Sequence, residues 1–220
     1  HRAVIDAARE ALDAPLGVIT FEPHPREFFA PDAPPFRLMN SESRANRLAR
    51  LGVEQLYELP FGPVLAGLSP EAFAREVLVD GLGVGHVTVG ADFCFGKKRA
   101  GNAATLAELG RHMGFGVTAV PLVGVKGRDY SSTAIRTALA EGRVREAETM
   151  LGHWHRIEGE VVHGDKRGHD FGWPTANMQV ENLHLPRLGV YAVLVDVLSS
   201  ASWLFLSILL SAQAPQSSRL

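Results

Sequence analysis

The sequence predicts an α/β fold, in which a Rossmann-like parallel sheet is followed by an incomplete β-rich unit. Across residues 16–151, short β-branched and apolar runs alternate with helical patterns of about ten residues. Such alternation implies crossovers between parallel strands, with helices covering both faces of the sheet. From Ile157 onward, glycine-punctuated strand patterns occur without helices. These two observations together predict the fold class.

The individual elements follow in order. The chain opens on a helical pattern whose apolar residues share one face, namely Val4, Ile5, Ala8 and Leu12. Strands are expected at 16–21, 54–61, 86–93 and 116–123. Helices are expected at 43–52, 69–82, 103–115, 133–142 and 144–152. The helix at 69–82 starts with Ser-Pro-Glu, an order typical of a helix N-terminus. Further strands are expected within 158–180 and at 189–198.

We expect three parts in the chain. Residues 1–152 form the α/β domain, and residues 153–198 form the start of an all-β domain. That second part is short, so its folding depends on help from a neighbour. Residues 199–220 form an atypical tail, because serine and apolar residues dominate it and charges almost vanish.

Composition narrows the choice of partners. Lys plus Arg is 22 and Asp plus Glu is 24, so the net charge of −2 gives no general attraction to nucleic acid or to an anionic membrane. The one cysteine, Cys94, is expected to be a small core residue in a reducing cytosol. The uncharged run at 197–214 is shorter than the roughly 20 residues of a membrane span. We therefore expect a cytoplasmic protein that binds small molecules, and a homo-oligomer is compatible with the sequence.

One glycine-rich motif is excluded from the candidate sites. GLGVGH at 81–86 resembles a dinucleotide-binding loop, but that loop needs its glycines after a strand and at the start of a helix. Here the glycines follow a helix and precede a strand, so we interpret them as a helix exit and a turn.

Two loops follow predicted strands at the edge where open α/β sheets bind their ligands. TFEPHPREFF at 20–29 has two prolines that stiffen the backbone around His24, and two phenylalanines that could form an apolar wall. GADFCFGKKRAGN at 90–102 combines aromatic residues, glycines and three cations suited to phosphate. The alternatives are a rigid loop with core aromatics for the first motif and a solvated basic turn for the second.

YSSTAIR at 130–136 stands at the start of a predicted helix. A serine or threonine there caps the helix, and the unpaired N–H groups of the first turn also form an anion site. Arg136 lies one turn further on and adds a guanidinium suited to two phosphate oxygens. A simple helix cap is the alternative.

These three motifs, in this order and spacing, resemble the adenylyltransferase module of bacterial bifunctional riboflavin kinase/FAD synthetases. The opening HR resembles the end of that family's HxGH loop, and GDKRGHDFGWPTAN followed by GVYAV is similar to the start of its riboflavin kinase domain. The resemblance runs from His1 to about Leu198 and implies a nucleotidyltransferase domain followed by part of a kinase β-barrel. It implies FAD synthesis from FMN and ATP, and phosphorylation of riboflavin to FMN, with Mg²⁺ as cofactor.

The resemblance also implies roles for individual residues. The residues expected to bind ATP are His1, Ser132, Thr133 and Arg136, and of these His1 and Arg136 are expected to act in catalysis. The residues expected to line the flavin are Pro23, His24, Pro25, Phe29, Asp92 and Phe95. In the kinase half, Thr175 and Asn177 of PTAN are expected to bind nucleotide and Mg²⁺, with Thr175 as the metal ligand.

The sequence departs from the family pattern in several places. The family's first strand and the first histidine of HxGH have no counterpart, His169 stands where arginine is usual, and Trp173 stands where Phe or Tyr is common. No counterpart of the kinase's catalytic glutamate follows GVYAV, so we expect the kinase half to be inactive. The alternatives are a flavin- or nucleotide-binding fragment without catalysis, and a nucleotidyltransferase for another small phosphorylated acceptor.

Overall fold

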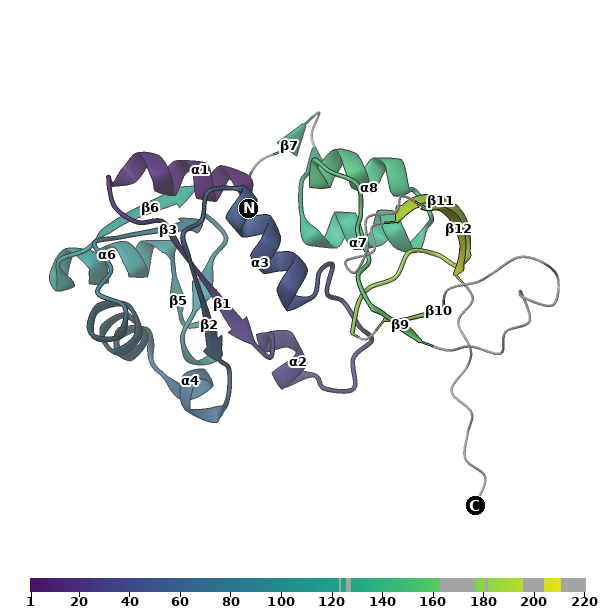
Figure 1. Cartoon of the computed structure of the whole chain (residues 1–220). Coiled ribbons are helices and arrows are strands. Elements are labelled where there is room, and N and C mark those ends of the chain that lie inside the picture. The colour runs from purple at the N-terminus through teal and green to yellow at the C-terminus, as the bar shows by residue number, and fades with distance from the viewer. Residues whose placement is uncertain (123, 126–127, 163–176, 181, 196–203, 211–220) are drawn as a thin grey trace, which may run out of the picture. The chain divides into compact units, whose positions relative to one another are not determined.

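The structure, a computed structural model of the 220-residue chain, describes residues 1–122, 124–125, 128–162, 177–180, 182–195 and 204–210 (Figure 1). It divides into two compact units, which are described separately below. Unit 1 comprises His1–Tyr130 and Ile157–Leu183, and unit 2 comprises Ser131–Arg156 and His184–Leu220.

Unit 1 contains the alternating strands and helices that the sequence predicts. Its helices are α1 (Arg2–Ala11), α2 (Pro25–Phe29), α3 (Ser41–Arg50), α4 (Pro63–Gly67), α5 (Pro70–Ala72), the π-type helix η1 (Phe73–Gly81), the 3-10 turn η2 (Lys97–Arg99) and α6 (Ala103–Met113). Its longer strands are β1 (Gly17–Glu22), β2 (Gln55–Pro60), β3 (His86–Gly90) and β6 (Gly116–Val120). Its short strands are β4 (Cys94–Phe95), β5 (Gly101–Asn102), β7 (Gly124–Val125), β8 (Arg128–Asp129), β9 (Glu160–Val162) and β10 (Asn177–Gln179).

The longer strands pair in parallel, which confirms the predicted α/β class. β1 pairs with β2 from Gly17 opposite Gln55 onward, and β3 pairs with β6 from His86 opposite Gly116 onward. In the described part of the chain these are two separate two-stranded ladders. The short strands pair antiparallel, β4 with β5, β7 with β8 and β9 with β10.

One hydrophobic core serves both parallel pairs. Its buried members are Phe73, Ala74, Leu78, Val89, Phe95, Leu106 and Phe115. Ile19 and Phe21 of β1 pack against this same cluster. Helices α1 and α6 both pack against the ladder of β3 and β6 (Figure 1). The loops that follow β1 and β3 therefore extend from strands that pack on the same hydrophobic core.

Local sequence explains where the helices begin and end. The side chain of Asn40 caps α3 by accepting a hydrogen bond from the Ser43 N–H at 2.7 Å, and Asn102 caps α6 in the same way. α6 ends at Gly114, whose φ of 87° lies in the left-handed region that favours glycine. Ile5 is buried on α1 as predicted, but Leu12 lies just beyond the helix and is 46% exposed. The expected helix included Leu12, but α1 ends one residue earlier.

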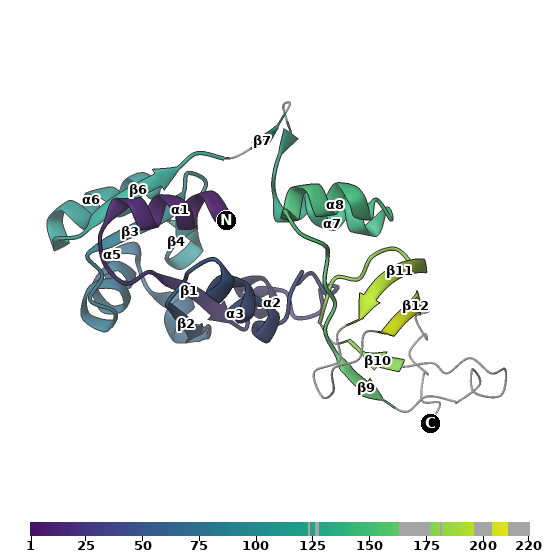
Figure 2. The same ribbon diagram turned by 45° about the horizontal axis from the view of Figure 1, so that its top comes forward.

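Unit 2 combines two helices with a β-ladder. α7 (Ser132–Ala140) and α8 (Val144–Leu151) lie side by side, and β11 (Gly189–Val195) pairs antiparallel with β12 (Leu204–Leu210) (Figure 2). The segment that leads into β11 is bound to α7: His184 Nε2 lies 3.0 Å from the carbonyl of Arg136, and the Arg187 N–H donates to the carbonyl of Leu139 at 2.8 Å. β12 falls within the residues predicted as an atypical tail. The described residues include no closed β-barrel.

Among the helices that the structure describes, none combines the length and the apolar character needed to cross a bilayer.

Candidate functional site

The loop of residues 23–25, which we call the PHP loop, connects the end of β1 to α2. Its first peptide bond, Glu22–Pro23, is cis, and His24 is the N-cap of α2. The Nδ1 atom of His24 accepts a hydrogen bond from the Arg26 N–H at 3.1 Å, and the His24 N–H donates to Glu27 Oε2 at 3.1 Å. This reciprocal capping box fixes the imidazole, and because Nδ1 is an acceptor, the neutral ring carries its proton on Nε2.

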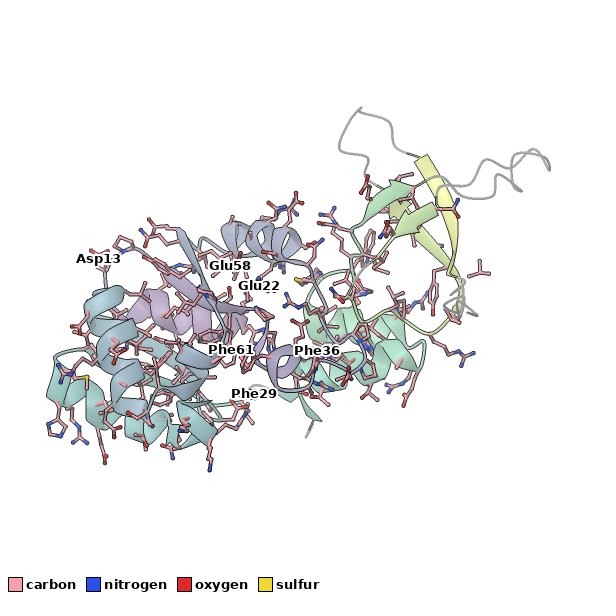
Figure 3. All side chains as sticks on the ribbon, turned by 90° about the horizontal axis from the view of Figure 1, so that it is seen from below. Asp13, Glu22, Phe29, Phe36, Glu58 and Phe61 are labelled. Atoms are coloured by element: carbon pink, nitrogen blue, oxygen red, sulfur yellow. The ribbon has the colours of Figure 1, made fainter. Side chains whose placement is uncertain are left out.

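An aromatic cluster borders the PHP loop. Phe29 is 69% exposed, and its ring meets those of Phe28 and Phe61 edge to face, with centroids 5.1 and 5.9 Å away (Figure 3). Phe61 in turn meets Phe21 of β1 at 5.6 Å. The sequence analysis did not identify Phe61, although this residue directly follows β2, whose carboxyl end lies beside that of β1. The cluster presents one exposed aromatic ring on a packed base, which suits an aromatic ligand.

The second loop follows β3 and contains Asp92 and Phe95. Asp92 is exposed, and its Oδ1 atom folds back to within 2.8 Å of the position a Cβ on Gly90 would occupy. Phe95 is only 7% exposed and belongs to the core cluster. Phe93 stacks on it at 5.6 Å with an interplanar angle of 9°. Phe95 therefore supports this loop from inside, and Asp92 is the predicted flavin residue of this loop that solvent reaches.

The basic residues of this loop are exposed. Lys97, Lys98 and Arg99 form the turn η2, and Lys98 and Arg99 have φ values of 55° and 58°. Cys94, expected in the core, is only half-buried, because neighbouring residues of a strand face opposite sides and Phe95 takes the inward position.

Capping at the start of α7 uses one hydroxyl. Ser131 is the N-cap, and its side chain accepts a hydrogen bond from the Ala134 N–H at 3.1 Å. Ser132 and Thr133 are the next two residues, and their N–H groups have no acceptor within the helix by geometry. Arg136 follows one turn later and is half-buried. Capping of α7 therefore does not explain why Ser132, Thr133 and Arg136 occur here.

A network of ion pairs joins the residues that flank the PHP loop. Arg37 binds Glu22 at the end of β1 and Glu27 of α2, while Arg44 binds Glu22 and Glu58 of β2. Figure 3 labels Glu22 and Glu58. Hydrogen bonds from Arg37 are the main cause that lowers the pKa of both Glu22 and Glu27 below the ordinary value. The same two carboxylates raise the pKa of Arg37. None of these residues stands out in the sequence alone.

The remaining predicted residues are distributed as follows. His1 is exposed at the start of α1, and its carbonyl accepts the N–H groups of Val4 and Ile5. Asn177 is exposed on β10, while Thr175 lies outside the described residues, as do His169 and Trp173. The predicted flavin residues belong to unit 1, and Ser132, Thr133 and Arg136 belong to unit 2. In the described part of the chain, no group of three or more His, Cys, Asp or Glu side chains gathers as a metal site would require.

A small cavity lies beside the PHP loop. It has a volume of about 280 Å³ and is bordered by Arg26, Glu27, Ala30, Pro31, Ala33, Pro34, Pro35, Phe36 and Asn182. The Arg26 guanidinium lies 4.8 Å from the centroid of the Phe36 ring. The volume is at the lower end of the roughly 300 to 1,000 Å³ of small-molecule pockets, so we assign no flavin to this cavity alone.

The parallel β–α units and the loops at their carboxyl ends define a Rossmann-like α/β protein. Residues 1–134 match the family model described as FAD synthetase, and residues 151–214 match the one described as riboflavin kinase. The chain belongs to the FAD synthetase family, which confirms the resemblance seen in its motifs. The kinase match extends into the residues predicted as an atypical tail.

Curated relatives agree with the two family matches. The chain is 41% identical over 206 residues to the bifunctional riboflavin kinase/FMN adenylyltransferase of Pseudomonas fluorescens, covering 92% of this chain and 66% of that protein. It is 38% identical to the proteins of the same name from Escherichia coli K12, covering 88% of this chain, and from Bacillus subtilis, covering 90% of this chain. The chain covers 63% of each of those two proteins, so it spans just under two thirds of the length of these relatives.

A solved structure shares the fold. A crystal structure described as a macrolide-efflux protein from Streptococcus pneumoniae superimposes with a TM-score of 0.79 and 31% sequence identity. The similarity covers 91% of this chain and 66% of that one.

Proposed function

We propose that the chain transfers AMP from ATP to FMN, giving FAD and pyrophosphate. The observation that carries this proposal is its 38 to 41% identity to relatives named as riboflavin kinases and FMN adenylyltransferases. The start of α7 supports it, because Ser132 and Thr133 stand in the first turn of the helix, where the dipole and the unpaired N–H groups favour anions, and Arg136 follows one turn later. ATP, FMN and riboflavin are the substrates that these family names imply.

In the proposed reaction, a phosphate oxygen of FMN attacks the α-phosphorus of ATP. A new P–O bond forms in line with the bond to the bridging oxygen, which breaks as pyrophosphate leaves. Such a transfer needs no covalent chemistry from the protein, so its residues act by positioning and by balancing charge. His1, the first-turn N–H groups of α7 and Arg136 would bind the ATP phosphates, and Arg136 would stabilise the leaving pyrophosphate.

The flavin would bind at the loops of unit 1. The exposed ring of Phe29, supported by Phe61, would contact the isoalloxazine, and the prolines of the PHP loop would keep the backbone rigid beside it. His24 offers an Nε2–H donor whose direction is fixed by the bond at Nδ1. The exposed carboxylate of Asp92 would face the same ligand, with Phe95 supporting its loop.

We further propose that Mg²⁺ balances the charge of the ATP phosphates when nucleotide is bound. Its fit to this chain rests on the exposed side-chain amide of Asn177, whose oxygen is a hard ligand of the kind Mg²⁺ prefers, and on the hydroxyl of Thr175. These two residues would bind nucleotide and metal in the riboflavin kinase half. We also propose a cytoplasmic protein, since the single cysteine suits a reducing compartment.

The direct test is to incubate the chain with FMN, ATP and Mg²⁺ and to quantify FAD and pyrophosphate by chromatography. The proposal predicts equal amounts of both products. If FMN fluorescence is quenched on mixing but no FAD forms, the chain binds flavin without catalysis. Pyrophosphate release with another phosphorylated acceptor, and none with FMN, would favour a different nucleotidyltransferase.

A further inference from the structure

Arg37 joins two carboxylates that come from different elements. Its Nη1 and Nη2 atoms donate to the two oxygens of Glu22 at 2.8 and 2.6 Å, a bidentate arrangement. Its Nε atom donates to Glu27 Oε1 at 2.6 Å, and its Nη2 atom also binds Glu27 Oε2. The Arg37 side chain is only 13% exposed, whereas Glu22 and Glu27 are 40% and 29% exposed, so the contacts are shielded from water on the arginine side.

The two carboxylates stand on either side of the PHP loop. Glu22 is the last residue of β1, and Glu27 occupies the third position of α2. Arg37 therefore clamps the strand end to the helix start, and the three loop residues are held between them. No other described side chain is recorded in contact with both of these carboxylates.

The clamp extends to both the backbone and the ring of His24. Glu27, the carboxylate that Arg37 orients, accepts the His24 N–H. Phe36, the residue before Arg37, meets the imidazole edge to face with centroids 4.8 Å apart and an angle of 70°. Moving the Arg37 segment would thus disturb the capping bond and the ring contact of His24 together.

Arg44 provides a natural comparison. It binds Glu22 at 3.3 Å and Glu58, but it has no recorded contact with Glu27 or with the PHP loop. A change at Arg44 would weaken the same charge network without releasing α2. The two arginines therefore separate a general contribution to stability from an effect on loop geometry.

We propose that Arg37 is a positioning residue, which holds the PHP loop between Glu22 and Glu27 and thereby sets the orientation of His24 toward the flavin. This inference rests on the proposed function where it concerns flavin affinity. Its geometric part, the orientation of His24, is independent of any ligand. A lysine at this position keeps one charge but lacks the planar fork that reaches both carboxylates at once.

The test compares Arg37→Lys with Arg44→Lys at a temperature below the melting point of both. Dissociation constants for FMN come from fluorescence quenching, and those for ATP come from calorimetry in the presence of Mg²⁺. We expect FMN to bind Arg37→Lys on the order of tenfold more weakly, with ATP affinity unchanged, because only the flavin loop has lost its alignment. Arg44→Lys should retain both affinities. Equal loss of FMN affinity in both variants, or no loss in Arg37→Lys, would overturn the proposal.

A second measurement tests the orientation of His24 without any ligand, so it does not depend on the proposed function. The ¹⁵N chemical shift of His24 Nδ1 in the ligand-free protein should report an acceptor nitrogen in the parent and in Arg44→Lys. In Arg37→Lys this ¹⁵N shift should move toward the value averaged over both tautomers of an unrestrained imidazole. A shift equal to that of the parent would refute the clamp. If the parent itself binds no FMN, the proposed function fails while this measurement still decides the role of Arg37. Should Arg37→Lys fail to fold, Glu27→Gln against Glu58→Gln gives the same comparison.

Discussion

Replacing Phe29 by alanine should weaken flavin binding and should cost less stability than replacing Phe95 by alanine. A phenylalanine buries about 200 Å² when fully covered, and each Å² is worth about 25 cal/mol. Phe29 is 69% exposed, so only the remaining third, about 60 Å² or roughly 1.5 kcal/mol, is at stake. Phe95 is 7% exposed, and its truncation should cost about 3 to 5 kcal/mol of the free energy of unfolding.

The effect on the ligand follows from the ring that Phe29 presents. An aromatic contact is worth about 0.5 to 1.5 kcal/mol beyond the area buried, so Phe29→Ala should bind FMN roughly two- to tenfold more weakly. Urea denaturation gives the stability and quenching of FMN fluorescence gives the affinity. FMN affinity equal to that of the parent would refute the assignment of Phe29 to the flavin wall. A larger loss of stability in Phe29→Ala than in Phe95→Ala would refute the packing.

Three further predictions concern capping, pH and packing. Ser131→Ala should cost about 1 kcal/mol of stability because it removes the cap of α7. Ser132→Ala should leave the ligand-free stability unchanged but reduce the rise in melting temperature caused by ATP and Mg²⁺. Thermal melts in which Ser132→Ala loses the stability and Ser131→Ala loses the ATP-induced shift would contradict this prediction. Burial, with smaller contributions from His153 and His184, lowers the pKa of His155 to about 4. The free energy of unfolding should therefore fall as the pH drops from about 6.5 toward 4, by at most about 3 kcal/mol. His155→Gln should flatten that dependence in denaturant titrations at several pH values. Gly101→Ala should cost about 1 to 3 kcal/mol in urea denaturation, since its Cβ would come within 2.7 Å of the Phe95 ring; a neutral result would mean that the ring moves freely.

The sequence predicted the parallel α/β part well because its signals are local. The β-branched runs of β1 and β3 and the capping residues at Ser69 and Asn102 act within a few residues, so pattern and chemistry agree there. The strand β11 was also predicted, from a glycine-punctuated strand pattern without helices.

The sequence could not predict how distant charges combine. Arg37 looks like any surface arginine in its own segment, and its role depends on Glu22 and Glu27, which are 15 and 10 residues away in the chain. Phe61 was missed for the same reason, because its partner Phe29 lies on another element. Phe95 shows the reverse case, since a motif residue assigned to the ligand by resemblance is buried in the core and acts on the loop from within.

The central claim is that the start of α7 binds the phosphates of ATP during adenylyl transfer. The most direct test measures FAD formation, together with the rise in melting temperature on adding ATP and Mg²⁺, in the parent, in Arg136→Ala and in Arg145→Ala, a control at an exposed position of α8. The loss of one charge-assisted contact, worth about 1.5 to 3 kcal/mol, should reduce FAD formation roughly ten- to a hundredfold and remove most of the ATP-induced shift in Arg136→Ala alone. Equal rates and equal shifts in all three proteins would contradict the account and leave the start of α7 as a helix cap.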